Sequence, residues 1–395
     1  MRLVIVGNGV AGINTVLTVV KNRPDADITI YSEEPYLYYP RPKLWDFLSG
    51  KISLEQLYFY PQSWYDERGI KVRLGRSVKE IKPGDKTVTL DNGQSAPYDC
   101  LLLATGGLAS VPPIENVKCP GVFTLRNVDD AVAIREYAGG ARAAVVIGGG
   151  LLGLESARGL KDLGLEVTVV EFFSWLLPKQ LDQQGAVVLN KKFESMGIQI
   201  VTGAASQAIE GDGRATGVLL KDGRHLPGDL ILISTGVRCN TALAVAAGLK
   251  VNRGVIVDEH LRTDGPDIYA VGDVVEFDGR SYGIIPAAIE QARIAGANIV
   301  GQVNEAYKGT VPSNTLKVVG VDLTTVGAFN APNESYQEHR FLDPDKGIYR
   351  KFVVHENRIV GAILLGLPKE VVSILKLIRE AQPLSVPIES LLNPA

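Results

Sequence analysis

One pattern occurs twice in this chain, and it limits the folds that the chain can adopt. The first copy consists of the apolar strand Arg2–Val6, the turn Gly7-Asn8-Gly9-Val10-Ala11-Gly12, an apolar helical segment, the strand Asp27–Tyr31 and the acid Glu33. The second consists of the strand Ala144–Ile147, the turn Gly148-Gly149-Gly150-Leu151-Leu152-Gly153, a helix, the strand Glu166–Val170 and the acid Glu171. Strand, glycine turn, helix, strand and acid in this order are typical of a βαβ unit that binds a dinucleotide.

Each glycine of the turn has a physical reason. Gly7 permits the tight turn, Gly9 lets backbone amides approach a pyrophosphate, and Gly12 lets helix and strand pack closely. Gly148, Gly150 and Gly153 repeat these positions in the second copy. The phosphates are expected at the helix starts, at Val10 and Ala11 and at Leu151 and Leu152, where free N–H groups favour negative charge. Glu33, about 20 positions beyond Gly12, suits a ribose hydroxyl.

Two dinucleotide sites in one chain have a simple use. One holds a flavin permanently, the other admits a nicotinamide cofactor, and a hydride passes between them. We therefore predict an α/β protein with two Rossmann-like domains, each of the three-layer ββα type, and a small α+β domain at the C-terminus. The expected domains are 1–112 with 241–309 for FAD, 113–240 for NAD, and 310–395 as an interface or cap.

Further strands are predicted to end at the edge where ligands of parallel sheets bind. One ends at Ala104-Thr105-Gly106, and the strand ending at Gly236 repeats its Thr-Gly. Another delivers Gly272 and Asp273, whose carboxylate can accept from flavin ribityl hydroxyls. A helix with Pro286 at its first position would turn its positive end toward the flavin, with Ile285 and Ala288 in contact.

Two local features allow two interpretations each. The proline-punctuated segment Tyr36–Leu44 is either a solvated connection whose tyrosines cover the core, or a loop that brings Arg41 and Lys43 to the flavin. Glu155, just past Gly153, is either an exposed carboxylate at a helix start or a group near the nicotinamide.

Composition excludes several classes of function. The chain has 395 residues, a net charge of −3 and no basic run, so nucleic acid is not an expected partner. No apolar run is long enough to span a membrane, and the N-terminus is already a core strand, so no signal peptide is expected. Three cysteines indicate a reducing compartment, most simply the cytoplasm. No metal site is predicted. Glu171 repels a 2′-phosphate, and Phe172, Phe173 and Ser174 offer no cation, so NADH is favoured over NADPH.

The last 85 or so residues differ in character. Leu316–Val319, Thr325-Val326, Ile348–His355 and Ile359–Leu365 predict an antiparallel sheet. Within Lys369–Glu380, an apolar stripe is expected to be a core or dimer face rather than a membrane anchor; its members are Val371, Val372, Ile374, Leu375 and Ile378. Candidate docking cations, which the sequence does not place on one face, are Lys308, Lys317, Arg350, Lys351 and Arg379.

With these motifs placed, the chain resembles the FAD-dependent pyridine nucleotide oxidoreductases of the glutathione-reductase-like superfamily. Within that superfamily it is similar to NADH:rubredoxin reductases and to the flavin-binding part of assimilatory nitrite reductases. The segments that carry the resemblance are Gly7–Gly12, Tyr39–Leu44, Leu103–Gly106, Thr124–Arg126, Gly148–Glu155, Asn240–Leu243, Val251–Gly254 and Ile268–Asp273.

The resemblance implies contacts to FAD from Glu33, Arg41 or Lys43, Val78, Arg126 and Asp273. It implies that NADH stacks on the flavin near Glu155, so that Arg41, Lys43 and Glu155 are the candidate catalytic residues. It also implies that the C-terminal domain caps the flavin and often forms a homodimer.

One departure from the superfamily decides the expected reaction. Residues 1–99 contain no cysteine, and Cys100, Cys119 and Cys239 form no C-x-x-C pair. The histidines at 225, 260, 339 and 355 also lack the His-Glu pairing of the disulfide reductases. We therefore expect electrons to pass from the flavin directly to a small redox protein, with rubredoxin the first choice and a ferredoxin-like or nitrite reductase partner the second. The alternatives are a quinone reductase and a redox sensor resembling apoptosis-inducing factor.

Overall fold

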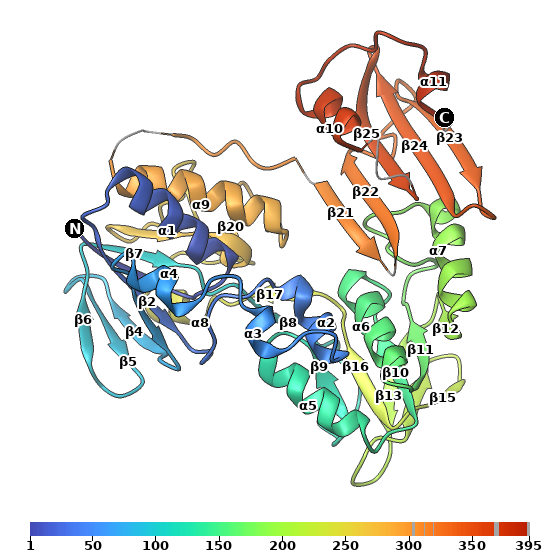
Figure 1. Cartoon of the computed structure of the whole chain (residues 1–395), viewed down its shortest axis with the longest axis horizontal. Coiled ribbons are helices and arrows are strands. Elements are labelled where there is room, and N and C mark those ends of the chain that lie inside the picture. The colour runs from blue at the N-terminus through green and yellow to red at the C-terminus, as the bar shows by residue number, and fades with distance from the viewer. Residues whose placement is uncertain (302–304, 312, 319, 367–370, 393–395) are drawn as a thin grey trace. The chain divides into compact units, whose positions relative to one another are not determined.

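The computed structural model describes residues 1–301, 305–311, 313–318, 320–366 and 371–392. The chain forms two compact units (Figure 1). The first comprises Met1–Phe47, Ile52–Leu108 and Val237–Thr310, and the second comprises Leu48–Lys51, Ala109–Gly236 and Val311–Ala395. The chain therefore leaves the first unit near Leu108 and returns to it at Val237. The finer division into three domains, with boundaries at 112, 240 and 309, stays a prediction.

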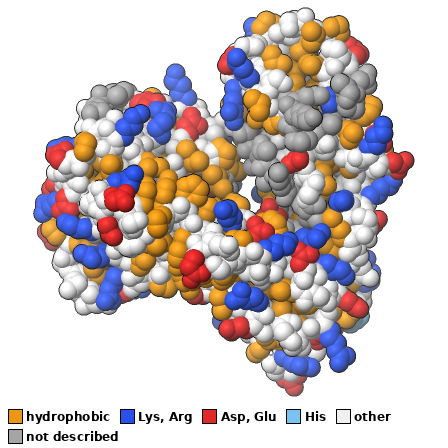
Figure 2. All heavy atoms as spheres, in the orientation of Figure 1, with side chains coloured by type: hydrophobic (Ala, Val, Ile, Leu, Met, Phe, Trp, Pro, Cys, Tyr) orange, Lys and Arg blue, Asp and Glu red, His pale blue; other side chains and the backbone are white. Residues whose placement is uncertain are grey.

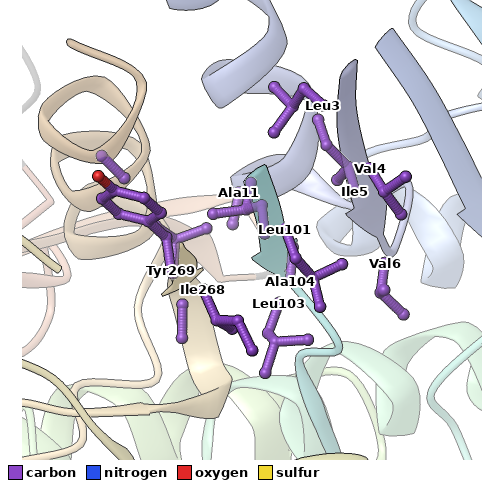
Figure 3. Close-up of a cluster of buried hydrophobic side chains, with 14 of the residues drawn as sticks. Leu3, Val4, Ile5, Val6, Ala11, Leu101, Leu103, Ala104, Ile268 and Tyr269 are labelled. Carbon is purple, nitrogen blue, oxygen red and sulfur yellow. The ribbon is translucent and has the colours of Figure 1, made fainter. Parts of the chain in front are cut away.

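A five-stranded parallel sheet forms the centre of the first unit. Its spatial order is β19 (Ile268–Ala270), β7 (Cys100–Leu103), β1 (Arg2–Val6), β2 (Asp27–Ser32) and β3 (Lys71–Leu74). The central strand β1 buries Leu3 and Ile5 on one face and Val4 on the other, as its uninterrupted apolar run requires of a strand covered on both faces. Figure 3 shows these side chains beside those of β7 and β19.

Two helices of the first unit, α1 (Val10–Asn22) and α9 (Ile285–Ile299), pack against each other. A Cβ on Gly296 of α9 would lie 2.8 Å from the Cβ of Thr18 in α1, so only glycine permits this approach. The remaining helices of this part of the chain are short: η1 (Arg41–Lys43), α2 (Leu44–Leu48), α3 (Leu54–Leu57), α4 (Gln62–Asp66), α8 (Ala242–Ala246) and η2 (Gly272–Val274). The remaining strands are β4 (Val78–Lys82), β5 (Thr87–Leu90), β6 (Ser95–Pro97), β8 (Gly107–Ala109), β17 (Val237–Cys239), β18 (Val255–Ile256) and β20 (Val275–Glu276).

The second unit contains a parallel sheet of the same design. Its order is β12 (Ile198–Val201), β11 (Glu166–Val170), β10 (Ala143–Ile147), β16 (Leu230–Ile233) and β9 (Val122–Thr124). Its helices are α5 (Val128–Ala138), α6 (Leu151–Asp162) and α7 (Gln183–Ser195), and a small antiparallel sheet consists of β13 (Ser206–Glu210), β14 (Gly217–Leu220) and β15 (His225–Pro227). In both units the strand before the glycine turn is central, which confirms the predicted pair of Rossmann-like folds.

The C-terminal part of the second unit is an antiparallel sheet with two short helices, as expected. The strand order is β21 (Ser313–Val318), β22 (Val321–Gly327), β25 (Arg358–Leu365), β24 (Ile348–His355) and β23 (Gln337–Asp343), followed in the chain by α10 (Val371–Arg379) and α11 (Ile388–Leu392). Of the predicted stripe, Val371 and Ile374 are buried in the core with Phe352, and only Val372 is strongly exposed, at 77%. The stripe is therefore mainly core. Val319, Lys369 and the side chain of Lys317 lie outside the described residues.

Strand β24 is buried on both faces. On the face toward α7, its charged and polar side chains pair with carboxylates of α7 and β23. The Nζ of Lys351 lies 3.1 Å from Asp182, which caps α7, and 3.0 Å from Glu338 of β23. Tyr349 donates its hydroxyl to Asp182 (2.7 Å), and its ring leaves no space for a side chain at Gly185 of α7. Lys351 is thus a buried structural cation and does not belong to a docking surface.

Three local expectations need correction. The segment Tyr36–Leu44, expected as a connection or a loop, is not irregular throughout, because Arg41–Lys43 forms a single 3₁₀ turn. The helix α9 begins at Ile285, so Pro286 is its second residue rather than its first; a proline is tolerated there because the first N–H groups of a helix have no intrahelical acceptor. Arg350 is buried, like Lys351, and donates to the carbonyl of Leu391 in α11 (2.5 Å).

We predict that Lys351→Met lowers the free energy of unfolding of the second unit by about 3 kcal/mol, because the partly buried carboxylates of Asp182 and Glu338 would keep only the half-exposed Arg340 as a cationic partner. Lys346→Met is the matched control. Lys346 is exposed and pairs with Asp343 at 3.5 Å, so its replacement should change stability by no more than about 0.5 kcal/mol. Thermal and urea unfolding of both variants test the difference, and equal stability of the two would contradict the account.

The same cluster gives the stability a pH dependence with a definite sign. Although burial opposes ionisation, hydrogen bonds from Gly185, Tyr349 and Lys351 hold the pKa of Asp182 below its ordinary value. For Glu338, burial is likewise outweighed by hydrogen bonds from Ala331 and Lys351, which lower its pKa. Carboxyls of this kind stabilise the fold above their unfolded pKa of about 4, and that stability is lost as the pH falls through the folded pKa. The stability that is lost on acidification should therefore be smaller in Lys351→Met than in the wild type.

Candidate nucleotide-binding sites

The two glycine turns have the same geometry. Gly7 (φ +114°) and Gly148 (φ +121°) both lie in a backbone region that side chains rarely adopt. A Cβ on Gly7 would overlap the carbonyl oxygen of Ala104, and one on Gly148 would overlap that of Ser234. In each unit, therefore, the turn presses directly against the end of the neighbouring strand, β7 or β16.

The other glycines of each turn separate into a packing position and an open position. A Cβ on Gly12 would overlap the carbonyl oxygen of Gly7, and one on Gly153 would overlap that of Gly148, so these two close the helix onto the turn. Gly9 and Gly150, by contrast, have no atom within 4 Å of an added Cβ. The open position is a cradle in which a pyrophosphate can contact the backbone.

The helices that start at these turns are free to bind an anion. Neither α1 nor α6, nor α9, has a side-chain cap or an acidic residue in its first turn. Helices α3, α5 and α7 have side-chain caps, from Ser53, Asn127 and Asp182. The uncapped N–H groups and the helix dipole are thus available to phosphate at α1 and α6 and to another electron-rich group at α9.

Asn8, between the first two glycines, has an unused donor. Its Oδ1 accepts from the hydroxyl of Tyr65 (3.3 Å), whose pKa burial raises, so Tyr65 remains a donor. The Nδ2 of Asn8 is buried, and no hydrogen-bond partner for it is found within the described residues. A buried amide donor beside an open cradle fits a bound phosphate or sugar oxygen. The residues of the first turn therefore fit a dinucleotide.

Gly272 brings Asp273 to the same edge of the first unit. A Cβ on Gly272 (φ +83°) would lie 2.8 Å from the Cβ of Ala11 in α1 and 3.9 Å from that of Ala288 in α9. The N–H of Gly272 donates to the buried Gln291 (2.8 Å). Asp273 thus follows a residue that lies between the first turns of two uncapped helices. In this position its carboxylate can accept hydrogen bonds from hydroxyl groups of a ligand.

Arg41 lies at this edge as well. It donates to Glu34 at 2.8 Å, and the hydroxyl of Tyr39 donates to the same carboxylate. Although burial opposes the charged form, electrostatic interactions with Tyr39, Glu34 and Asp273 keep the pKa of Arg41 above its ordinary value. Lys43 is exposed. Tyr39 is buried, as the first interpretation of this loop expects, and Arg41 lies in the electrostatic field of Asp273; the approach of Arg41 and Lys43 to a flavin stays a prediction.

The two acids at the strand ends are not equivalent. Glu33 is exposed, and within the described part of the chain it makes no hydrogen bond, so it is available to a ribose. Glu171 is buried, and it accepts from the N–H of Gly149 at Oε2 (2.6 Å) and from that of Phe173 at Oε1 (2.8 Å). The sequence predicted only a ligand contact for Glu171. Its role in holding the glycine turn was missed.

The sequence also missed the role of the two Thr-Gly pairs. Thr105 donates its hydroxyl to the carbonyl of Asn240 (2.8 Å), and Thr235 donates to that of Ser110 (2.6 Å). Each threonine thus ties a strand end to the segment on which the chain enters or leaves that unit. The repetition of Thr before Gly was the available signal, but its partners are distant in sequence.

The remaining predicted site residues lie in separate places. Val78 is buried at the start of β4, Arg126 precedes the capping box of α5, and Glu155 is buried in α6. Burial of Glu155 argues against the exposed helix-start interpretation. Its contact with a nicotinamide stays a prediction, as do the contacts of Val78 and Arg126 with FAD.

The three cysteines form no disulfide in the described residues, and the histidines there belong to no cluster with metal-binding geometry. Cys100, Cys119 and Cys239 are all free, and burial raises the pKa of the Cys100 thiol. His225 does pair with a glutamate, Glu210 at 2.7 Å, but on the exposed antiparallel sheet β13–β15. In the described ranges, no group of three or more His, Cys, Asp or Glu side chains could hold a metal ion. No helix there is long and apolar enough to cross a membrane.

Two dinucleotide cradles, each on its own parallel sheet, define the chain as an NAD(P)H-dependent flavoprotein oxidoreductase. Residues 1–293 match the family model of the pyridine nucleotide-disulphide oxidoreductases, and residues 312–382 match that of the rubredoxin NAD+ reductase C-terminal domain. The chain therefore belongs to the pyridine nucleotide-disulphide oxidoreductase family, which confirms the resemblance found in the sequence.

Individual relatives agree with this assignment. The chain is 34% identical to the assimilatory nitrate reductase electron transfer subunit of Bacillus subtilis, over 100% of this chain and 51% of the relative. It is 30% identical to the NADH-rubredoxin oxidoreductase of Clostridium acetobutylicum, over 92% and 91%. In a crystal structure of the covalent putidaredoxin reductase–putidaredoxin complex, the similar chain has 27% identity and a TM-score of 0.87, with 99% and 95% covered.

The chain spans about half the length of several curated relatives that it matches. It covers 51% of the nitrate reductase subunit and 45% of a Bacillus subtilis nitrite reductase. The activities of those longer proteins therefore do not transfer directly.

We predict that Gly9→Ala weakens FAD binding without destabilising the fold, and that Gly12→Ala destabilises the fold. The backbone at Gly9 (φ −92°) suits alanine and the space is open, so the apoprotein should keep its melting temperature while the Kd for FAD rises about tenfold or more. Gly12→Ala should instead lower the melting temperature of the apoprotein, because its Cβ overlaps Gly7. Calorimetry and FAD titration of both variants check this; unchanged FAD affinity in Gly9→Ala would place the pyrophosphate elsewhere.

Proposed function

We propose that the chain binds FAD in its first unit and NADH in its second, and passes electrons to a small redox protein. Rubredoxin is the first choice of acceptor and a ferredoxin-like protein the second. The observation that supports this most is the pair of matched nucleotide cradles in a chain whose three cysteines are all free. Without a redox disulfide, electrons leave the cofactor directly for an external acceptor.

Bound FAD supplies the conversion of a two-electron hydride into single electrons. The residues of the chain supply binding and electrostatics. Gly9 and the N-terminus of α1 would hold the pyrophosphate, Glu33 the adenosine ribose, and Asp273 the ribityl hydroxyls. The uncapped start of α9 would stabilise negative charge on the reduced ring, and Arg41 would offset charge near the phosphates.

The second unit favours NADH over NADPH. A 2′-phosphate would approach the carboxylate of Glu171, and residues 172–178 contain no cation to offset that charge. Glu171 is fixed by two backbone hydrogen bonds, so it cannot swing away from an added phosphate. We therefore expect weaker binding of NADPH than of NADH.

The acceptor is proposed from chemistry and from relatives rather than from a surface. Figure 2 shows Lys and Arg side chains interspersed with Asp and Glu on the visible face, so no docking patch of one sign stands out there. The C-terminal match to rubredoxin reductases supports a rubredoxin-like partner. A homodimer through this domain and a cytoplasmic location remain parts of the proposal, the latter supported by the free cysteines.

A second candidate function has specific support. One relative is an electron transfer subunit of a nitrate reductase, and about half of it matches the whole of this chain. The acceptor would then be a further domain or subunit of a nitrate or nitrite reductase. The quinone reductase alternative is weaker, because the stripe of α10 packs mainly into the core.

Rapid mixing under anaerobic conditions tests the proposal. FAD-loaded protein should lose its yellow colour on mixing with NADH, and the reduced protein should then be offered rubredoxin, ferredoxin, a soluble quinone or oxygen. We expect reoxidation by one of the two iron proteins to be the fastest. Fastest reoxidation by quinone would favour a quinone reductase, and slow bleaching that no acceptor reverses would favour a sensor.

We predict that Arg41→Gln raises the Kd for FAD about tenfold, because the phosphates would lose a nearby positive charge and the carboxylate of Glu34 would lose its ion pair. Lys43→Gln is the control. Lys43 is exposed, so its replacement should change the Kd less than about threefold. Fluorescence titration of the apoproteins with FAD measures both Kd values. A larger effect of Lys43→Gln than of Arg41→Gln would contradict the assignment of Arg41 and point to Lys43 as the cation near FAD.

A further inference from the structure

One buried polar side chain of the first unit joins helix α9 to the residue before Asp273. Gln291 of α9 is 1% exposed, and its Oε1 accepts from the N–H of Gly272 at 2.8 Å. Gly272 (φ +83°) lies against Ala11 of α1 and Ala288 of α9, so its backbone is confined by both helices. The side chain of Gln291 thus fixes the direction of the backbone from which Asp273 follows.

The NH2 group of the same side chain continues into a chain of hydrogen bonds. The Nε2 of Gln291 donates to the hydroxyl of Tyr307 (3.4 Å), a side chain that is 1% exposed. That hydroxyl lies 2.7 Å from the Oγ1 of Thr310, which donates to the carboxylate of Glu290 at 2.6 Å. Because Thr310 gives its one hydroxyl proton to Glu290, Tyr307 must donate to Thr310. Burial raises the pKa of Tyr307 to about 12, so its hydroxyl keeps that proton.

Every hydrogen bond of this chain therefore points the same way, from the N–H of Gly272 to the carboxylate of Glu290. The reverse orientation of the Gln291 amide would set its NH2 group against the N–H of Gly272, so that two donors would face each other. Hydrogen bonds that follow one another in a buried chain polarise and strengthen each other. The chain of bonds thus leaves Gln291, and with it the backbone of Gly272, one favourable arrangement.

The segment that supplies Tyr307 is itself held in place. Glu305 accepts two hydrogen bonds from Arg293 of α9 (2.8 and 2.6 Å), and its carbonyl accepts from the buried Asn298 (2.9 Å). The N–H of Tyr307 donates to the carbonyl of Glu259 (2.6 Å). Residues 305–310, at the end of the first unit, are therefore fixed along α9, and the hydroxyl of Tyr307 is presented from a rigid support.

We propose that Gln291 and Tyr307 are positioning residues of the flavin site. They hold the backbone of Gly272 and so keep the carboxylate of Asp273 where it accepts from the ribityl hydroxyls of FAD. This inference rests on the proposed binding of FAD in the first unit. A carboxylate that meets its ligand without reorganising binds it more tightly, and the chain of hydrogen bonds supplies that preorganisation.

The test compares the wild type with Gln291→Met and Tyr307→Phe by fluorescence titration of each apoprotein with FAD. Methionine has about the length of glutamine without its hydrogen-bonding groups, and phenylalanine removes only the hydroxyl. We expect the Kd for FAD to rise about tenfold in Gln291→Met and about threefold in Tyr307→Phe. ADP has no ribityl chain, so its inhibition constant as a competitor of FAD should stay unchanged. Competition with FAD restricts the ADP measurement to the site that FAD occupies.

Tyr98→Phe is the matched control. Tyr98 is completely buried in the same hydrophobic cluster as Tyr307, but its hydroxyl has no hydrogen-bond partner within the described residues. Its replacement should therefore leave the Kd for FAD unchanged.

A double variant shows whether Gln291 acts through Asp273. Combined with Asp273→Ala, Gln291→Met should weaken FAD binding no further than Asp273→Ala does alone. Effects that simply add would overturn the inference, because Gln291 would then act on FAD by another route.

Two further outcomes would overturn the inference. Unchanged FAD affinity in Tyr307→Phe would do so, and this variant decides the question if Gln291→Met does not fold. Equal weakening of FAD and ADP binding would indicate a general distortion of the unit. Failure of the wild type itself to bind FAD would instead refute the proposed function.

Discussion

The structure depends on one repeated contact, in which a glycine turn presses against the end of a neighbouring strand. Gly7 against Ala104 and Gly148 against Ser234 leave no room for a Cβ. Because the turn lies so close to the sheet, the following helix begins directly at the carboxyl edge with its first N–H groups unused. Packing of the turn thus creates the positive helix end that a dinucleotide requires.

The two units share this contact but differ in the residues around it. The acid at the end of the second strand is exposed in the first unit and makes no hydrogen bond to any described residue, whereas in the second unit it holds the glycine turn through the N–H of Gly149. This asymmetry fits one site that holds its cofactor permanently and one that binds and releases a cofactor in each cycle.

The sequence was sufficient to predict the fold, because the motifs that specify the two sheets are local. A glycine turn between a strand and a helix, repeated with its acid, predicted both sheets. It was insufficient where the role of a residue depends on a distant partner. In the sequence Lys351 resembles a surface cation, but in the structure it pairs with Asp182 and Glu338. The sequence likewise gives no sign that the carboxylate of Glu171 accepts hydrogen bonds from Gly149 and Phe173. Thr105 and Thr235 are similar cases, because their acceptors lie more than a hundred residues away.

The central claim is that one chain carries two separate dinucleotide sites. Native mass spectrometry of the protein, with FAD and ADP-ribose added together, tests this most directly. The account predicts a species with one FAD and one ADP-ribose per chain, and loss of only the ADP-ribose when Gly150 is replaced by a bulky residue. A chain that never carries more than one nucleotide, or one in which ADP-ribose displaces FAD, would contradict it.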